Sequence, residues 1–147
     1  MSWRQRYVGA PLLDEQVHTV ACGVEMSANG RMKPAERMKI DRQSMPMQDG
    51  PLRCGNFTEV NLGLPGRIAM IEAQRCLQCK DARCIAGCPV RIDIPGFIDR
   101  VAQGDMPGAA AVLLHDNALP GISGRVCPQE TQCECQCVRG KKAGCSV

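Results

Sequence analysis

Cysteine spacing is the feature of this sequence that most limits the folds open to it. Four cysteines stand in the thirteen-residue run from Cys76 to Cys88, and Pro89 follows directly, which gives the pattern C-x2-C-x4-C-x3-C-P. A second run, CPQETQCECQC, extends from Cys127 to Cys137. The 147 residues include eleven cysteines but only two Phe, one Tyr and one Trp. A core so poor in aromatic residues is marginal, so we expect another source of stability.

The cysteines are expected to bind metal rather than to pair as disulfides. An odd number would leave one thiol over, and the N-terminal stretch MSWRQRYVGAPLLDEQ lacks the apolar segment of a secretory signal. No run approaches the roughly 18 apolar residues of a membrane span. We therefore expect a cytoplasmic protein without a membrane span, where clustered cysteines more often hold metal. The formal net charge of +3 argues against a dedicated nucleic-acid binder.

Helical signals dominate from residue 64 onward. The stretch LPGRIAMIEAQRCLQC predicts a helix that begins near Pro65. Its expected buried stripe is Ile68, Ile71, Ala73, Cys76 and Leu77.

Two further helices are predicted by start and stop signals. Asp93 and Pro95 begin the first of them, and Gly104 ends it. Its inward residues are expected to be Phe97, Ile98 and Val101. Asp105 and Pro107 begin the other, which is expected to end near Asn117.

The N-terminal part carries weaker signals. Residues 1–60 are expected to form an extension, and residues 61–147 a helical domain. Apolar residues at helical spacing predict one short helix within the extension, over Leu13, Val17, Val20 and Val24. The segment at 29–51 is rich in turn formers and charge, so we expect it to be extended and to wrap around the domain. No stretch alternates convincingly as a strand, so the predicted fold class is mostly α, with cysteine-rich loops between and after the helices.

The cysteine pattern favours an iron–sulfur cluster over structural zinc. A zinc site usually has two C-x2-C pairs separated by a longer spacer, and within the first run only Cys76 and Cys79 have that spacing. The bacterial ferredoxin pattern is C-x2-C-x2-C-x3-C-P, in which the fourth cysteine binds the other cluster. This chain differs from it by two extra residues before Cys84. A zinc-stabilised interaction module remains an alternative prediction.

Two long stretches resemble one known family. EAQRCLQCKDARCIAGCPVRIDIPGFI and AAAVLLHDNALPGISGRVCPQETQCECQCVRGKK closely resemble the N-terminal iron–sulfur domain of the glutamate synthase small subunit. The same helical ferredoxin-like domain occurs in dihydropyrimidine dehydrogenase and in the large subunit of NADH-dependent ferredoxin:NADP oxidoreductase. The resemblance covers about residues 37–142 and implies a helical domain around two 4Fe–4S clusters.

The resemblance also implies which residues bind each cluster. The ligands of one cluster would be Cys76, Cys79, Cys84 and Cys137. Those of the other would be Cys88, Cys127 and Cys133. The family completes the second set with a Glu or Gln just downstream of the second cysteine run, and the given sequence ends at Val147, before that position. The expected substitutes are Glu134, Cys135, Cys145 or solvent, and we expect this second cluster to be the more labile one.

The resemblance implies electron transfer as the function. We expect no catalytic site in the chain itself, because it has no dinucleotide fingerprint and no nucleophile–histidine–acid set, and only two histidines. FAD and NAD(P)H are expected only in an adjoining region, so the expected partners are a flavin-containing domain or subunit and a second redox subunit. The chain would be the iron–sulfur part of an NAD(P)H-dependent oxidoreductase such as glutamate synthase. A standalone ferredoxin-like subunit is the alternative within the same chemistry.

Overall fold

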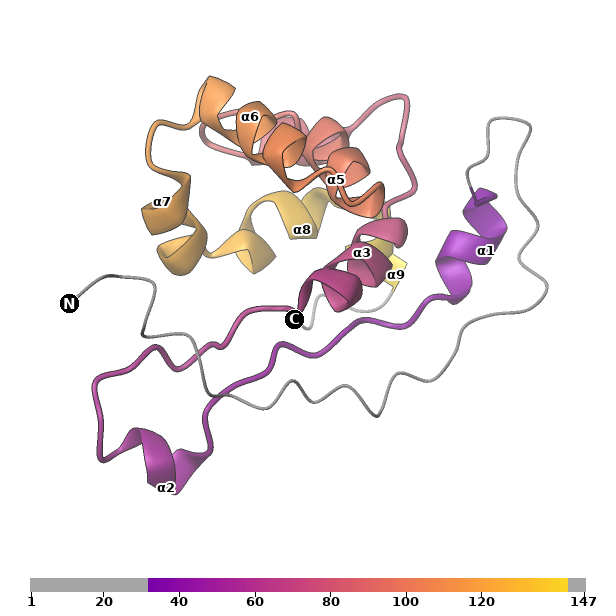
Figure 1. The fold of residues 1–147 in the computed structure, drawn as a ribbon. Coiled ribbons are helices and arrows are strands. Elements are labelled where there is room, and N and C mark those ends of the chain that lie inside the picture. Colours follow the sequence, from indigo (N-terminus) through magenta and orange to yellow (C-terminus); the bar gives the residue numbers. More distant parts are fainter. Residues whose placement is uncertain (1–31, 143–147) are drawn as a thin grey trace.

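The computed structural model describes residues 32–142, and this part of the chain is helical (Figure 1). The elements in chain order are α1 (Pro34–Lys39), α2 (Gly50–Arg53), α3 (Gly66–Gln74), α4 (Arg83–Gly87), α5 (Ile94–Ala102), α6 (Met106–Asp116), α7 (Pro120–Val126), the 3-10 turn η2 (Gln129–Thr131), α8 (Cys133–Gln136) and α9 (Val138–Lys142). The one β bridge that joins two described residues pairs Met47 with Asn61. The predicted fold class, mostly α, is confirmed.

Helices α5 and α6 begin with the same local structure. The side chain of Asp93 accepts a hydrogen bond of 3.1 Å from the backbone N–H of Gly96. Asp105 accepts one of 2.9 Å from Gly108 in the same way. A Cβ on either glycine would collide with the capping carboxylate, so the sequence D-x-P-G suits this turn. Both predicted helix starts are confirmed.

The predicted helix ends are also close to the observed ones. Gly104, with φ of +77°, follows α5 in the left-handed conformation that glycine adopts at little cost. Helix α6 ends at Asp116, and Asn117 caps it through its backbone N–H. Helix α3 begins at Gly66, one residue after the proline that predicted its start.

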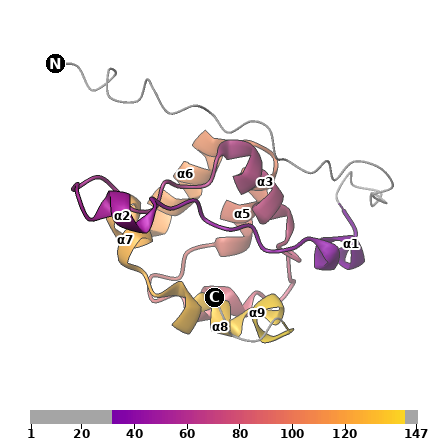
Figure 2. The same cartoon turned by 90° about the horizontal axis from the view of Figure 1, so that it is seen from below.

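Helices α3, α5 and α6 pack together, with α5 contacting both others, and lie in the upper part of Figure 2. Ala73 of α3 is 8% exposed and Ala109 of α6 is 3% exposed. These are the only buried apolar residues among residues 32–142, and no large side chain in that part is fully buried. The stripes predicted for α3 and α5 are otherwise only partly buried. The apolar core alone therefore contributes little to stability.

Helices α4, α8 and α9 lie on the other side of the molecule, where α8 contacts α4 and α9 (Figure 2). Gly87, at the end of α4, makes this contact possible. A Cβ there would stand 3.0 Å from the backbone oxygen of Gln132 and 3.2 Å from the Cα of Cys133. The absence of a side chain lets the two short helices approach closely.

The segment before α3 runs along the helices and turns back on itself at α2 (Figure 1). The two arms are joined by backbone hydrogen bonds of 2.9 Å from Gln48 to Val60 and from Leu62 to Pro46. The prediction that residues 29–51 are extended is wrong for α1 and α2. Pro34 starts α1, and the following AERMK are good helix formers, which outweigh the charge and turn residues around them.

Several predictions fall outside the described residues or stay untested. The expected helix over Leu13, Val17, Val20 and Val24 lies outside them, as does Cys145. The division into an extension (1–60) and a domain (61–147) stays a prediction. Within residues 32–142 no helix has the length and apolar character needed to cross a membrane.

Candidate metal centre

The seven cysteines that the sequence singles out lie in short helices or in the segments that join the helices. Such helices let the chain reverse direction often, so thiols far apart in sequence can meet. In chain order they are Cys76 and Cys79 after α3, Cys84 in α4, Cys88 directly after α4, Cys127 directly after α7, Cys133 at the start of α8 and Cys137 directly after α8.

Four of these thiols interact with one another. Burial raises the pKa of the Cys76 thiol; a hydrogen bond from the backbone N–H of Gln78 lowers it, and the nearby Cys137 and Cys79 raise it. Burial likewise raises the pKa of Cys84, and so do Cys137 and Cys76. Because coulombic interactions weaken with distance, Cys76 lies near Cys79, Cys84 and Cys137. We call Cys76, Cys79, Cys84 and Cys137 the first thiol group.

Three other thiols form a second set. Burial raises the pKa of Cys133 to about 11, and Cys127, Glu134 and Cys88 raise it in the same direction. The Cys127 thiol also donates a hydrogen bond of 3.6 Å to the side-chain oxygen of Gln132. We call Cys88, Cys127 and Cys133 the second thiol group. Its members are the three cysteines that the family resemblance assigns to one cluster.

Helix α4 carries one thiol of each group. Cys84 lies within α4 and Cys88 is the residue that caps it. Four residues of helix rise only about 6 Å, so the two groups are adjacent. The close approach of α8 at Gly87 then places Cys133 beside Cys88.

Two arginines connect the first thiol group to the N-terminal segment. Arg37, only 7% exposed, donates to the backbone oxygen of Cys76. Arg139, two residues after Cys137, donates to the backbone oxygens of Arg37 at 2.8 Å and of Ile40 at 2.7 Å. The sequence analysis missed both roles, because an arginine in a charged stretch is usually solvated. Arg37 stands in a charged stretch without an apolar stripe, so the sequence did not indicate that its side chain is buried.

Two of the residues proposed as substitute ligands make contacts with other parts of the chain. Glu134 forms an ion pair of 3.4 Å with Arg42, although it also lies near Cys133. The Cys135 thiol donates to the backbone oxygens of Thr131 at 3.4 Å and of Gln132 at 3.1 Å. Cys145 lies outside the described residues.

The donor chemistry of the thiol groups, all cysteine, suits an iron–sulfur cluster. Among residues 32–142, no group of three or more His, Cys, Asp or Glu side chains is arranged to hold a metal ion. Sulfurs around one zinc stand within about 4 Å of one another, because each is about 2.3 Å from the metal. A 4Fe–4S cluster is larger, since each cysteine binds a different iron. Burial and neighbouring thiols raise the pKa of Cys76, Cys84 and Cys133. Bound iron would supply the positive charge that stabilises their thiolates.

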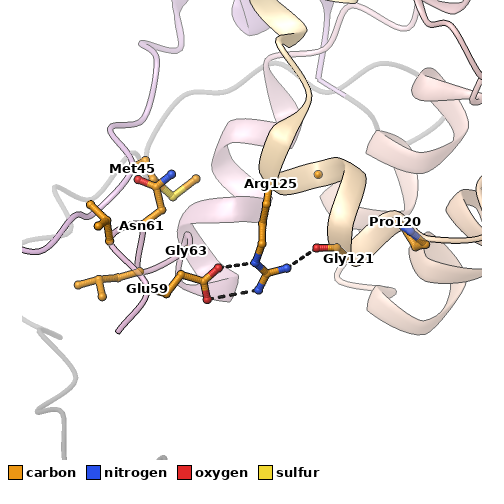
Figure 3. Close-up of a pocket in the computed structure, with 10 residues that line it drawn as sticks. Met45, Glu59, Asn61, Gly63, Pro120, Gly121 and Arg125 are labelled. Carbon is orange, nitrogen blue, oxygen red and sulfur yellow. Dashed lines mark hydrogen bonds and ion pairs between the residues drawn. The ribbon is translucent and has the colours of Figure 1, made fainter. Parts of the chain in front are cut away.

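An open surface cleft of about 590 Å³ lies between the segment before α3 and α7 (Figure 3). Arg125 donates to both carboxylate oxygens of Glu59 and to the backbone oxygen of Gly121. The hydrogen bond from Arg125 lowers the pKa of Glu59. No cysteine lines the cleft, so it is not part of either thiol group.

Comparison with known proteins agrees with the cysteine chemistry. The family model described as dihydropyrimidine dehydrogenase domain II, 4Fe–4S cluster, matches residues 53–147. The chain is 34% identical over 98 residues to the glutamate synthase [NADPH] small chain of Halomonas elongata, covering 67% of this chain and 21% of the relative. It is 40% identical over 72 residues to the NAD-dependent dihydropyrimidine dehydrogenase subunit PreT of Escherichia coli, covering 49% of this chain and 18% of the relative.

A third relative has a different name but similar coverage. The putative oxidoreductase UacF of Escherichia coli is 37% identical over 90 residues, covering 60% of this chain and 14% of the relative. The chain thus spans about a fifth or less of the length of these relatives. The family match covers more than half of the chain, including all seven cysteines of the two thiol groups. The chain therefore belongs to the 4Fe–4S family of dihydropyrimidine dehydrogenase domain II.

Proposed function

We propose that this chain holds two 4Fe–4S clusters and relays electrons between them within a larger oxidoreductase. The first thiol group binds one cluster, and the second thiol group supplies three ligands to the other. The observation that carries the proposal is the arrangement of α4, whose Cys84 and Cys88 belong to different thiol groups. Since four helical residues rise only about 6 Å, two clusters bound there would be neighbours.

The bound clusters supply one-electron redox chemistry at potentials that depend on their surroundings. The protein's residues hold each cluster, limit its contact with water and surround it with charge. Cys76, Cys84 and Cys133 are partly buried, whereas Cys79 and Cys127 are exposed. Each thiol group thus has one side open to solvent or to a partner, through which an electron can enter or leave.

We further propose that the electron donor is the flavin of an NAD(P)H-dependent oxidoreductase of the glutamate synthase type. The relatives include proteins named as an NADPH-dependent glutamate synthase chain and an NAD-dependent dehydrogenase subunit, which supports this assignment. Their matched segments are about a fifth of their length, so a nucleotide- and flavin-binding region has room elsewhere in such proteins. A second redox centre on a partner subunit then accepts the electrons.

The cluster number is tested by metal analysis of anaerobically prepared protein. Two clusters predict about eight iron and eight sulfide per chain, and a brown colour that dithionite bleaches. EPR of the reduced protein is expected to show two S = 1/2 signals broadened by their mutual interaction. About four iron per chain with one simple signal would contradict the two-cluster proposal. A colourless protein that holds zinc instead would contradict the redox function altogether.

The flavin donor is tested separately. In a chimera, this chain's residues 53–147, which the family model matches, replace the corresponding segment of the Halomonas elongata glutamate synthase small chain. NADPH is expected to bleach the cluster absorbance of the chimera but not that of the isolated chain. If dithionite reduces the clusters of the chimera and NADPH does not, the flavin-relay proposal is wrong while cluster binding stands.

A further inference from the structure

Gln78 lies between two cysteines of the first thiol group and directs its side-chain amide at one of their sulfurs. Its side-chain nitrogen lies 3.6 Å from the Cys76 sulfur and donates to it.

The backbone and a second contact hold Gln78 in this position. Its φ is +53°, in the left-handed region that residues with a side chain rarely adopt. The side-chain nitrogen also donates to the backbone oxygen of Pro95, at 3.1 Å, in the first turn of α5. Residues kept in such a conformation concentrate at functional sites, where the surrounding structure imposes it.

We propose that Gln78 is a positioning residue that raises the reduction potential of the cluster held by the first thiol group. The inference rests on the proposed function, since it requires a cluster ligated by Cys76. Reduction adds negative charge to a cluster and its sulfur ligands. A hydrogen bond donated to a ligand sulfur therefore stabilises the reduced state more than the oxidised state.

A purely structural role for Gln78 makes a different prediction. In that role, the Gln78 side chain only connects the cysteine loop to α5 through its hydrogen bond to the backbone oxygen of Pro95. In that case its removal would change stability but not the potential of a cluster that still assembles. The reduction potential is thus the readout that separates the two roles.

The test is an EPR-monitored redox titration of the anaerobic protein with both clusters bound, comparing the wild type with Gln78→Met. Methionine has nearly the same length but no donor, and the backbone N–H remains. One hydrogen bond is expected to change the reduced-to-oxidised ratio at a fixed potential by about two- to tenfold. This corresponds to a lowering of about 20 to 60 mV for a one-electron couple, since tenfold is 59 mV. The second cluster's potential is expected to stay unchanged.

Gln136→Met is the matched control. The Gln136 side-chain nitrogen also donates at 3.6 Å to a cysteine sulfur, but to Cys135, which belongs to neither thiol group. Its loss is expected to leave the potential of the first cluster unchanged. Gln78→Glu is the second variant, because it keeps the length, lacks the N–H and adds negative charge, so it should lower the potential at least as much as methionine.

The outcomes separate the inference from the proposed function. Clusters present with unchanged potentials in both Gln78 variants would overturn the inference and leave the two-cluster proposal intact. Loss of the first cluster in both variants would also overturn it, because Gln78 would then be needed for assembly. Absence of any cluster from the wild type would overturn both.

Discussion

Arg139 donates a hydrogen bond of 2.8 Å to the backbone oxygen of Arg37, and Arg37 in turn donates to the backbone oxygen of Cys76. The two contacts connect α9, α1 and the end of α3 in one chain of hydrogen bonds. Arg139 follows Cys137 by two residues. These hydrogen bonds therefore link the surroundings of Cys137 with those of Cys76, and both belong to the first thiol group. The segment around α1 is thus part of the structure that positions these thiols.

Replacing Arg37 with methionine is expected to destabilise the protein. The guanidinium is 7% exposed and donates to the backbone oxygens of Met32, Gln74 and Cys76. Hydrogen bonds from a charged donor are worth about 1.5–3 kcal/mol each, and the freed carbonyls recover part of this from water. We expect Arg37→Met to lower the free energy of unfolding by about 2–3 kcal/mol, measured by urea unfolding of the anaerobic protein.

Lys39→Met is the control for that change, because it removes a positive charge from the same helix. The Lys39 side chain is 72% exposed and forms an ion pair of 2.8 Å with Glu36. Such a surface pair contributes at most about 1 kcal/mol. Equal effects of the two substitutions would contradict a structural role for the buried arginine.

The contact between α4 and α8 is expected to be sensitive to any side chain at Gly87. A Cβ there would stand 3.0 Å from the Cγ of Gln136 and 3.0 Å from the backbone oxygen of Gln132. We expect Gly87→Val to lower the free energy of unfolding by about 1–3 kcal/mol through overpacking. Because Cys88 and Cys133 meet at this contact, we also expect faster loss of iron to a chelator, followed by absorbance.

Gly124→Val in α7 is the matched control, since a Cβ at Gly124 would meet nothing within 4 Å. Its effect on unfolding is expected to stay within about 0.5 kcal/mol. If Gly87→Val kept the wild-type stability and rate of iron loss, the close α4–α8 contact would not stabilise the protein or the bound clusters.

Removal of the clusters is expected to unfold much of the helical structure. Ala73 and Ala109 are the only buried apolar residues in the part of the chain that the structure describes, so the helices have little core to hold them. Metal binding then contributes directly to folding, as in other small metal-binding domains. Far-UV circular dichroism before and after anaerobic chelation measures this. Retention of the full helical signal by the metal-free protein would contradict it.

The helices with a local start signal were predictable from sequence. Asp93 and Asp105 each stand before x-Pro-Gly, and both carboxylates cap the following helix as expected. Short helices without an apolar stripe were not predicted. Helix α7 starts at Pro120, and its apolar residues Ile122 and Val126 are exposed. It has no buried apolar stripe, so the sequence lacks the periodic pattern that predicts a helix.

The sequence predicts which cysteines bind a cluster, and that assignment stays a prediction; their supporting contacts could not be predicted. Spacing and family resemblance single out residues such as Cys84 and Cys137, because a cluster demands cysteine at fixed positions. Arg37 donates a hydrogen bond to the backbone oxygen of Cys76, and Gln78 donates one to the Cys76 sulfur. Such contacts depend on how distant segments pack, and a single sequence carries no signal for them.

The most direct test of the two-cluster arrangement compares Cys84→Ala with Cys88→Ala. Both residues belong to one short stretch around α4, but the account assigns them to different clusters. Each variant, prepared anaerobically, is expected to keep about four iron per chain and one S = 1/2 EPR signal, and the two remaining signals should differ from each other. Cys54→Ala, which changes an exposed cysteine outside both thiol groups, should keep about eight iron. If the Cys84 and Cys88 variants lost the same signal, the two thiols would belong to one site and the account would be wrong.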